Sequence, residues 1–427
     1  MTARSLLVLF MVIGIIYDLI TMYIAARQRK KPLPPEVADV YDADRYQQYL
    51  SYVADHRKSA LIVSGVSFIA TTALYYADIY PSLEAAFNGN PYLIFIATML
   101  IFGIVSTVID VIDSYYTTFF IRERYGLNRQ DRKGFIRDTA LDILQGTVIT
   151  LALGMILVFI GEHMAKWTNG FSVSLPAALL IAVAIAAVIA VFVIGASFFS
   201  IWILKKQYTF TPLPEGDLRT KVMALQAGAK KQVRIINVYD ESKKSTSKNA
   251  FLLKFLWHRE FGIADNFLNG NAEDELLAVL SHEIGHLKHK KNLLNWLGYA
   301  FLGALFCLFV LVVHRPGAIL NVNAWIRASF NTRANNYCLL IAVYSACFTP
   351  LGKAIGIFNN YRSRCEEYEA DREAVKNGYG EALITTFKRL SSDELVNVNP
   401  HPIIEFLEYN HPGMYQRIKA IRAAERA

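Results

Sequence analysis

Residues 281–290 read Ser-His-Glu-Ile-Gly-His-Leu-Lys-His-Lys and contain the pattern H-E-x-x-H at His282, Glu283 and His286. On a helix, positions i and i+4 lie one turn apart, so both imidazoles could share one zinc ion. Glu283 would then stand beside the metal and could take a proton from a water that the zinc activates. The preceding run, 271–280, has an Asn start signal, acidic residues in its first turn and apolar residues after them, which predicts the required helix. Because the pattern can arise by chance, a third ligand is needed.

The composition is that of a membrane protein. Of 427 residues, 54% are hydrophobic, and the mean hydropathy is +0.28. A soluble domain averages roughly 45–50% apolar residues, so the excess must lie in long apolar stretches. A helix needs about 18–20 apolar residues to cross a bilayer. Seven stretches approach or exceed that length, at about 5–24, 59–79, 93–119, 139–161, 175–204, 293–313 and 337–358.

The distribution of Lys and Arg predicts the orientation of these spans. Basic residues cluster after the first span, between Arg27 and Lys31, and after the third, between Arg122 and Arg137, whereas 80–92 has none. This alternation puts the N-terminus on the outer or lumenal side and both long polar segments in the cytosol. The net charge of +8 fits this bias and contact with the anionic lipid bilayer. Basic and aromatic residues do not alternate in a patch, so no nucleic-acid partner is expected.

The predicted fold class is a mainly α, polytopic membrane protein with seven transmembrane helices and a small α+β, zincin-like cytosolic domain. Residues 1–204 would hold five spans, 205–292 the first half of the protease domain, 293–358 the last two spans, and 359–427 the second half. The last two spans would thus split the catalytic domain. The four cysteines are isolated, which argues against a disulfide framework or a cysteine-rich metal site.

Several polar residues fall inside the predicted spans. A carboxylate facing lipid is costly, so each should face protein or water. One interpretation is hydrogen bonding between helices, and the other is a polar chamber that the spans enclose. The residues concerned are Asp18, Asp110, Asp113, Asp142 and Gln145.

The segment before the zinc motif predicts a small sheet. Residues 218–229 are typical of a short helix, and 233–239 and 249–254 have strand composition. An extended substrate could add itself to an edge of such a sheet and lie across the metal. The tyrosine-rich run 37–58 is interpreted as a helix with a solvated interfacial face.

The third zinc ligand is expected in the charged helix predicted at 361–375. Glu367 and Asp371 are four residues apart and share a face, so Glu367 could complete a His2Glu site. Asp371 could accept a hydrogen bond from a ligand imidazole and fix its tautomer. On spacing alone, Glu366 and Glu369 compete with Glu367.

Three further residues are candidates near the metal. His289 shares a face with His286, but about 10 Å of helical rise separates it from His282, so a solvated position is favoured. His411 stands in a turn before the last helix, where a structural role competes with stabilisation of an oxyanion. Arg417 on that helix could anchor His411 or bind a substrate carboxylate.

The chain resembles the type I CAAX prenyl proteases, which are intramembrane zinc metalloproteases with seven spans. The resemblance covers nearly the whole chain and includes the order of the motifs and the interrupting helical pair. Its most specific parts are the stretches 121–130, 247–251, 277–286, 363–371 and 410–412.

The resemblance implies roles for individual residues. The family's third zinc ligand belongs to an E-x-x-A-D pattern, which falls here on Glu367. Its edge strand that holds the substrate backbone falls on Asn249 and Ala250, and its active-site His and Arg fall on His411 and Arg417. It also implies one zinc ion per chain and a large water-filled chamber among the spans.

The resemblance further implies removal of the last three residues from farnesylated or geranylgeranylated CAAX proteins, in the endoplasmic reticulum membrane with the catalytic domain facing the cytosol. In some members a second cut follows upstream. The family usually has a His where this chain has Lys291, so a role for that His is not carried over. Two alternatives remain: a general quality-control protease of membrane proteins with the same zinc chemistry, and a non-enzymatic seven-span receptor or transporter with an accidental motif.

Overall fold

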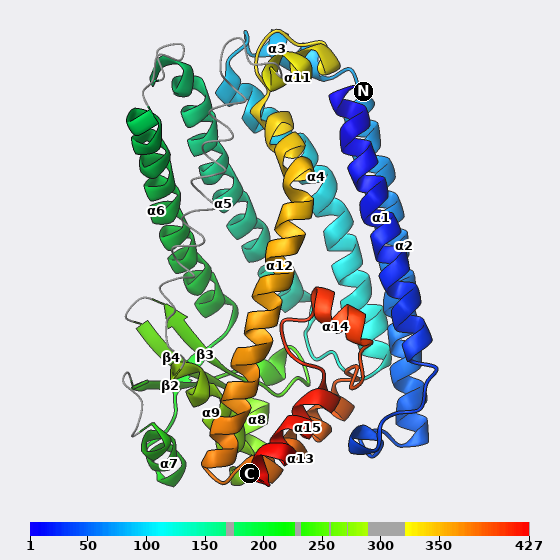
Figure 1. The fold of residues 1–427 in the computed structure, drawn as a ribbon, viewed down its shortest axis with the longest axis vertical. Coiled ribbons are helices and arrows are strands. Elements are labelled where there is room, and N and C mark those ends of the chain that lie inside the picture. Colours follow the sequence, from blue (N-terminus) through cyan, green and yellow to red (C-terminus); the bar gives the residue numbers. More distant parts are fainter. Residues whose placement is uncertain (168–174, 227–231, 256–257, 271, 289–320, 427) are drawn as a thin grey trace.

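The computed structural model describes residues 1–167, 175–226, 232–255, 258–270, 272–288 and 321–426. Long helices run side by side through most of the molecule, and a small sheet with several short helices gathers at one end (Figure 1). The N-terminus lies at the opposite end from the sheet, and the C-terminus lies beside it.

Six helices in the described part of the chain are long and apolar enough to cross a membrane. The chain is therefore a multi-pass membrane protein. These helices coincide with six of the seven predicted spans, and the remaining stretch, 293–313, lies outside the described residues. The six helices are α1 (Ala3–Gln28), α2 (Ala43–Tyr76), α4 (Pro91–Tyr116, continued by a π-helical turn to Arg122), α5 (Arg132–Trp167), α6 (Leu175–Gln207) and α12 (Tyr337–Lys376).

Side-chain caps fix where several of these helices begin. The Asp42 carboxylate accepts a hydrogen bond from the Arg45 amide at 2.7 Å, so α2 begins at Ala43. Asn90 accepts from two amides of the first turn of α4, with Pro91 at its first position. Both residue types are preferred there because they satisfy amides that have no partner within the helix.

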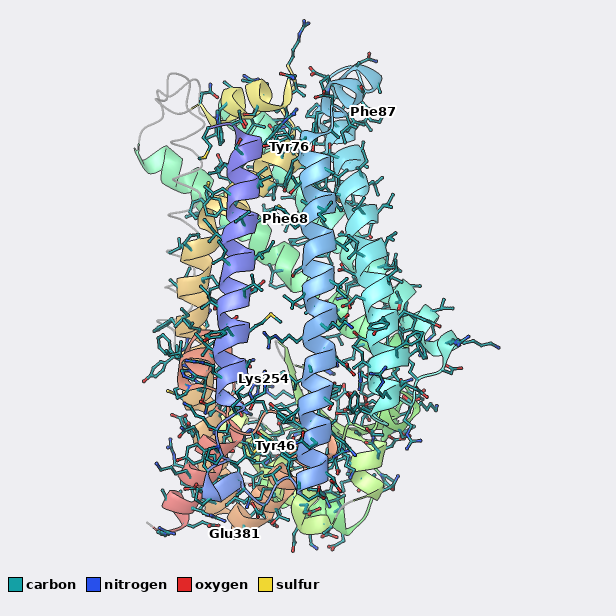
Figure 2. The ribbon with its side chains drawn as sticks, turned by 90° about the vertical axis from the view of Figure 1, so that its right-hand side faces the viewer. Tyr46, Phe68, Tyr76, Phe87, Lys254 and Glu381 are labelled. Atoms are coloured by element: carbon teal, nitrogen blue, oxygen red, sulfur yellow. The ribbon has the colours of Figure 1, made fainter. Side chains whose placement is uncertain are left out.

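The tyrosine-rich run before the second span is solvated only in part, because its aspartates at 39, 42 and 44 are exposed whereas two of its tyrosines are buried. Tyr41 and Tyr49 stack on each other and are 7% and 2% exposed. The Tyr41 hydroxyl donates to the carbonyls of Ser391 and Val396 at 2.8 and 2.7 Å. Figure 2 shows α2 running from Tyr46 near the sheet end to Tyr76 at the other. The base of α2 is thus tied to the C-terminal helices.

The sheet has four strands in the order β1–β2–β4–β3. The strands are β1 (Phe210–Pro212), β2 (Ile235–Tyr239), β3 (Ala250–Phe255) and β4 (His258–Ala264). β2 and β4 pair in parallel, and the other pairs are antiparallel. β2 and β3 match the predicted strands, whereas β1 and β4 were not predicted. Among the described residues, β3 is an edge strand of this sheet.

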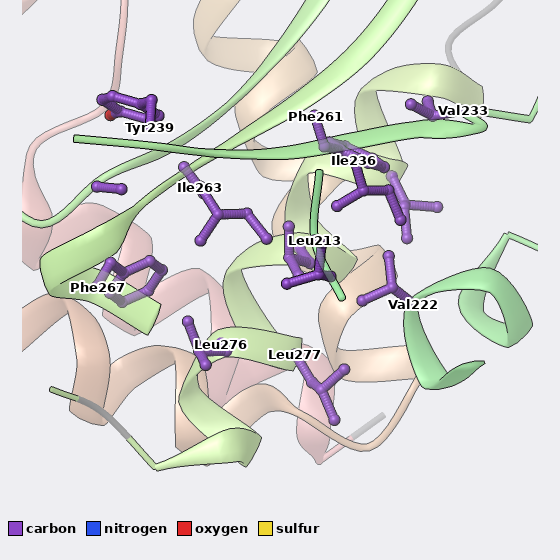
Figure 3. Packing of buried hydrophobic residues seen from close by; sticks show 14 residues of the cluster. Leu213, Val222, Val233, Ile236, Tyr239, Phe261, Ile263, Phe267, Leu276 and Leu277 are labelled. Carbon is purple, nitrogen blue, oxygen red and sulfur yellow. The ribbon is translucent and has the colours of Figure 1, made fainter. Parts of the chain in front are cut away.

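The sheet packs one face against α9 (Glu273–Lys288), the helix with the H-E-x-x-H motif. Phe261 and Ile263 alternate on β4 and are fully buried, as are Leu277 and Leu280 on α9. Figure 3 shows this apolar layer, with Phe267 and Val222 at its two ends. Burying such side chains stabilises the fold by about 1.5–3 kcal/mol each, so the layer holds α9 in a fixed orientation. The predicted helix at 218–229 is α7 (Asp217–Leu225), and its last residues lie outside the described part.

The last span and the charged segment after it form one continuous helix, α12, of 40 residues. The domain boundary predicted at 358/359 falls inside this helix. Pro350 lies within it, because a membrane helix tolerates the missing amide where neighbouring groups compensate. Beyond α12 follow three shorter helices: α13 (Gly380–Asp393) packs against α9, whereas α14 (Pro402–Glu408) and α15 (Met414–Glu425) pack against α12. At the opposite end lie α3 (Tyr80–Ala86) and α11 (Val322–Phe330).

Four of the five polar residues expected inside the spans either bond helices to each other or line a cavity, whereas the Asp18 side chain on α1 is exposed. Asp113 accepts a hydrogen bond from Ser59 at 2.6 Å, and Gln145 donates to Ser200 at 3.0 Å, so helices are bonded to each other. Asp110 and Asp142 line a cavity of about 670 Å³ between α2, α4 and α5. A second cavity of about 420 Å³ reaches the loops beside the sheet and shares Asp142 with the first. Open space thus extends from among the spans, where its lining is mainly apolar, toward the sheet, where its lining is mainly polar.

Candidate metal centre

Helices α9 and α12 bring three potential metal ligands together. The rings of His282 and His286 lie one turn apart with their centroids 4.9 Å from each other. Glu367 on α12 places Oε2 at 3.4 Å from Nε2 of His282 and Oε1 at 3.2 Å from Nε2 of His286. One ligand atom from each residue lies within 4.8 Å of the others.

The close approach of the two helices depends on small residues. A Cβ added to Gly285 would lie 2.6 Å from Cα of Ala370, so the helix backbones meet there without side chains between them. Ser281 accepts a hydrogen bond from the Asn377 amide at 2.7 Å, and Lys288 forms an ion pair with Glu373. Contacts on both sides of Gly285 therefore fix α9 against α12.

The structure separates Glu367 from its rivals. Glu366 forms an ion pair with Arg362 at 3.3 Å, and Glu369 is exposed on another side of α12. Glu367 is 4% exposed and faces both imidazoles. His289 lies outside the described residues.

The three side chains fit a zinc ion. Oε2 of Glu367 is buried and has no hydrogen-bond partner, although a buried carboxylate oxygen normally has one. Nδ1 of His282 is engaged by Asp371 at 2.9 Å, so Nε2 remains available. Two imidazole nitrogens and one carboxylate oxygen are a donor set of catalytic zinc sites.

Asp371 forms hydrogen bonds with two side chains of the site, those of His282 and Arg417. It accepts from Nδ1 of His282, which fixes the ring tautomer and orientation. Arg417 binds it with two hydrogen bonds, from Nε at 2.9 Å and from Nη2 at 2.6 Å. The Arg417 guanidinium also lies 4.1 Å from the Phe387 ring centroid and 3.4 Å from the Glu367 carboxylate. Arg417 thus neutralises two buried acids, and its role in substrate binding stays a prediction.

Burial and neighbouring charges change the proton affinities at the site. Burial disfavours the charged form of His282, but the hydrogen bond to Asp371 and the nearby Glu367 carboxylate outweigh it and raise its pKa to about 9. Burial raises the pKa of Glu283, while His282 and His286 oppose the shift. A carboxylate with a raised pKa is a stronger base, which suits a group that must accept and return a proton.

His411 reaches the same site from the turn between α14 and α15. Its Nε2 lies 3.4 Å from Oε1 of Glu367, and its side chain is 57% exposed. Its Nδ1 contacts Oδ1 of Asn410 at 2.9 Å. Burial lowers the pKa of His411 below its ordinary value, although the Glu367 carboxylate opposes this shift.

Asn249 and Ala250 stand at the start of the edge strand β3. The Asn249 carbonyl accepts from the Ala264 amide at 2.9 Å, which ties the start of the strand to β4. Further along β3, Nζ of Lys254 donates to the His286 carbonyl at 3.0 Å. The free edge of the sheet therefore runs beside the helix that carries both histidines.

Two residues at the site were not predicted from the sequence. Phe387 on α13 packs on Arg417, and Glu394 at the end of α13 accepts hydrogen bonds from the Ser247 hydroxyl at 2.8 Å and the Lys248 amide at 3.3 Å. Glu394 thereby holds the loop that leads into Asn249. Neither residue belongs to a local motif, because α13 has the ordinary apolar periodicity of a surface helix.

Comparison with known proteins gives two family matches. A family model described as the CAAX prenyl protease N-terminal region, with five membrane helices, matches residues 22–200. A model described as peptidase family M48 matches residues 212–425. The two matches meet near the start of the sheet.

Individual relatives match over almost their whole length. A CAAX prenyl protease 1 homolog from Oryza sativa subsp. japonica is 26% identical, over 97% of this chain and 96% of that protein. A probable CAAX prenyl protease 1 from Schizosaccharomyces pombe is 27% identical, over 94% and 85%. The crystal structure of S. mikatae Ste24p superimposes with a TM-score of 0.76 and covers 99% of both chains at 23% identity, which is a likeness of fold.

Proposed function

Because this chain belongs to peptidase family M48 and is a metalloprotease with multiple membrane helices, we propose that it removes the C-terminal tripeptide from prenylated CAAX proteins. One observation carries the proposal: α9 and α12, which are far apart in the sequence, bring His282, His286 and Glu367 within 4.8 Å of one another. The names of relatives that match nearly the whole chain support the substrate class.

We assign the metal ligands to these three residues and the metal to zinc, one per chain. A zinc ion held by these residues would lower the pKa of a bound water toward ~7 and polarise a carbonyl group. Asp371 and Arg417 hold His282 and Glu367 in place from behind. The protein thereby presents the ligands in one arrangement before substrate binds.

Glu283 is the proposed general base. Its raised pKa lets it take a proton from the attacking water and keep that proton until the amine leaves. It then returns the proton to the departing nitrogen. His411 would donate a hydrogen bond from Nε2 to the oxygen on which negative charge develops, which requires a proton on Nε2.

The substrate would lie along β3. An extended peptide adds main-chain hydrogen bonds to an open sheet edge, and Asn249 and Ala250 provide the first of these groups. The cavities among the spans would give the prenylated chain a path that stays inside the membrane. We expect the endoplasmic reticulum membrane, with the sheet end in the cytosol, by analogy with type I CAAX proteases and from the distribution of basic residues.

The test combines metal analysis with cleavage of a farnesylated CAAX peptide by the full chain in lipid nanodiscs. We expect one zinc per chain and release of the tripeptide. Glu283→Ala should keep zinc and lower kcat by about 10²–10⁴-fold, because it removes only the base. Full activity in that variant, or a chain without zinc, would reject the mechanism.

Two comparisons make the test specific. Glu367→Ala should lose zinc, whereas Glu366→Ala on the same helix should keep both zinc and activity. An unprenylated twin peptide reports on substrate class. Equal cleavage of both peptides would favour the quality-control alternative and reject prenyl specificity.

A further inference from the structure

The turn that carries His411 is held at its start by a buried arginine of α12. Nη1 of Arg364 donates to the Glu405 carbonyl at 2.9 Å and also to the Tyr409 carbonyl. Arg364 is 8% exposed, so these bonds form away from water. Glu405 lies in the last turn of α14, where its carbonyl also accepts from the Tyr409 amide at 3.2 Å, and Tyr409 is the residue that caps the C-terminal end of this helix.

The end of the turn, at Gly413, is held by Glu405 of α14. The Glu405 carboxylate accepts from the Gly413 amide at 3.1 Å, and one turn before Arg364 the Asn360 amide donates to the Leu407 carbonyl at 3.5 Å. The backbone from 409 to 413 is therefore fixed on both sides of His411.

The anchoring of the turn is important because the His411 ring makes few contacts itself. More than half of its side chain is exposed, and its Nδ1 contacts Oδ1 of the adjacent residue, Asn410, at 2.9 Å. A ring with so few contacts takes its position from its backbone. The distance of 3.4 Å between its Nε2 and Glu367 therefore depends on where the turn is anchored.

The charged guanidinium of Arg364 also faces the carbonyl groups that fix the turn. In the described part of the chain it forms no ion pair, and its charge is instead compensated by carbonyl oxygens. The C-terminal end of a helix carries partial negative charge, so a cation there is favourable. Arg364 is also one turn from Glu367 on α12, so a single rigid helix bears both a metal ligand and the anchor of His411.

We infer that Arg364 is a positioning residue that sets His411 over the metal ligands. This inference rests on the proposed role of His411 in catalysis. Without Arg364 the turn would move, and His411 would lose its alignment while the ligands stayed in place.

The test uses three variants of the full chain in nanodiscs. Arg364→Met removes the donors and keeps the apolar stem, and we expect kcat to fall about 10- to 100-fold, as for a misplacement of about 1 Å, with KM and zinc content unchanged. Arg364→Lys keeps one donor group that can replace Nη1, so it should retain most of the wild-type activity. Arg362→Met, which breaks only the ion pair with Glu366, is the matched control and should leave kcat unchanged.

A double-mutant cycle separates positioning from general damage. In a His411→Ala background, Arg364→Met should lower kcat no further, because the group that it positions is absent. An equal further fall in that background, or loss of zinc from Arg364→Met, would overturn the inference. If wild type cleaves the prenylated peptide and His411→Ala is impaired but Arg364→Met is not, only this inference fails. No cleavage by wild type would instead reject the proposed function.

Discussion

His282 contacts a different acid through each of its ring nitrogens. Nδ1 bonds to Asp371 at 2.9 Å, and Nε2 lies 3.4 Å from Glu367, so both nitrogens face carboxylates. This environment favours the imidazolium and raises the pKa of His282 to about 9 against the effect of burial. A metal needs the neutral ring, so proton and metal compete for Nε2.

Zinc affinity should therefore depend on pH. In the metal-free protein, His282 is protonated below about pH 9, so zinc binding must release that proton. The apparent affinity should fall about tenfold for each pH unit between about pH 9 and 7. Competition with a chelator of known affinity measures the slope.

Asp371→Asn is the control for this prediction. It removes the carboxylate that raises the His282 pKa, so the slope over the same interval should become flatter. An affinity that is constant with pH in the wild-type chain would contradict the argument.

At the scale of elements, the contact between α9 and α12 and the anchoring of β3 decide the site. α9 is fixed to the sheet by its apolar face and to α12 by the approach of Gly285 to Ala370. β3 is fixed at its start through the loop that Glu394 holds. The contact between α9 and α12 sets the distances between the metal ligands. The anchored loop sets the position of the β3 edge that we propose to bind substrate.

Gly285→Ala should separate the two helices. The new Cβ would lie 2.6 Å from Cα of Ala370, a backbone atom that cannot turn away. We expect destabilisation of about 1–3 kcal/mol and weaker zinc binding. Thermal unfolding and zinc stoichiometry measure both.

Gly352→Ala on α12 is the matched control, because a Cβ there meets no atom within 4 Å. It should be neutral or slightly stabilising. Normal zinc content in Gly285→Ala would show that the helices do not need this close approach.

Glu394→Ala should weaken substrate binding more than chemistry. It removes the acceptor for the Ser247 hydroxyl and the Lys248 amide, so the strand edge at Asn249 becomes less ordered. We expect KM to rise about tenfold, the equivalent of about 1.4 kcal/mol, with zinc content unchanged.

Lys248→Met tests the side chain of the same loop. It breaks the pair between Nζ and Asp393 but leaves the backbone bond to Glu394. Its KM should stay near the wild-type value. A kcat defect with normal KM in Glu394→Ala would instead point to an effect on the metal ligands.

At the scale of the whole molecule, the sheet and the C-terminal helices gather at one end of the spans, and α3 and α11 cap the other (Figure 1). The base of α2 joins this assembly through Tyr41 and through Arg45, which donates to the carbonyls of Ser392 and Asp393. Segments from both ends of the sequence therefore support the candidate site.

The two ends should lie on opposite sides of the membrane. We expect Ala85→Cys to react with an impermeant maleimide from the outer or lumenal side, and Lys376→Cys to react only after permeabilisation. Sealed vesicles of known sidedness provide the measurement. The background must lack the native cysteines, Cys307, Cys338, Cys347 and Cys365. The reverse labelling pattern would invert the predicted orientation.

The sequence predicted those features that local periodicity encodes. Six spans, the α9 helix and the strands β2 and β3 depend on runs of apolar residues, and the structure has them. β4 was missed because Glu260 interrupts its apolar pattern. This carboxylate is 1% exposed and is satisfied by Lys205 at 2.8 Å and Asn237 at 2.7 Å. Partners that distant in the chain leave no local trace.

The candidate site was predicted in the same uneven way. His282, His286 and Glu367 follow from helical spacing and a resemblance, and the structure brings them together. Arg364, Phe387 and Glu394 depend on contacts between helices that no spacing rule relates. The continuity of α12 was also missed, since a charged segment after an apolar one suggests a boundary.

α12 is one continuous helix that connects the membrane-spanning part to the end of the molecule with the candidate metal centre. From Tyr337 to Glu367 it spans 30 residues, about 45 Å, so a change in tilt of 1° would displace the Glu367 carboxylate by about 0.8 Å. A shift of that size is comparable to the misplacements that slow enzymes about a hundredfold. Lipid thickness changes helix tilt, so we expect turnover to vary with the acyl-chain length of the surrounding lipid.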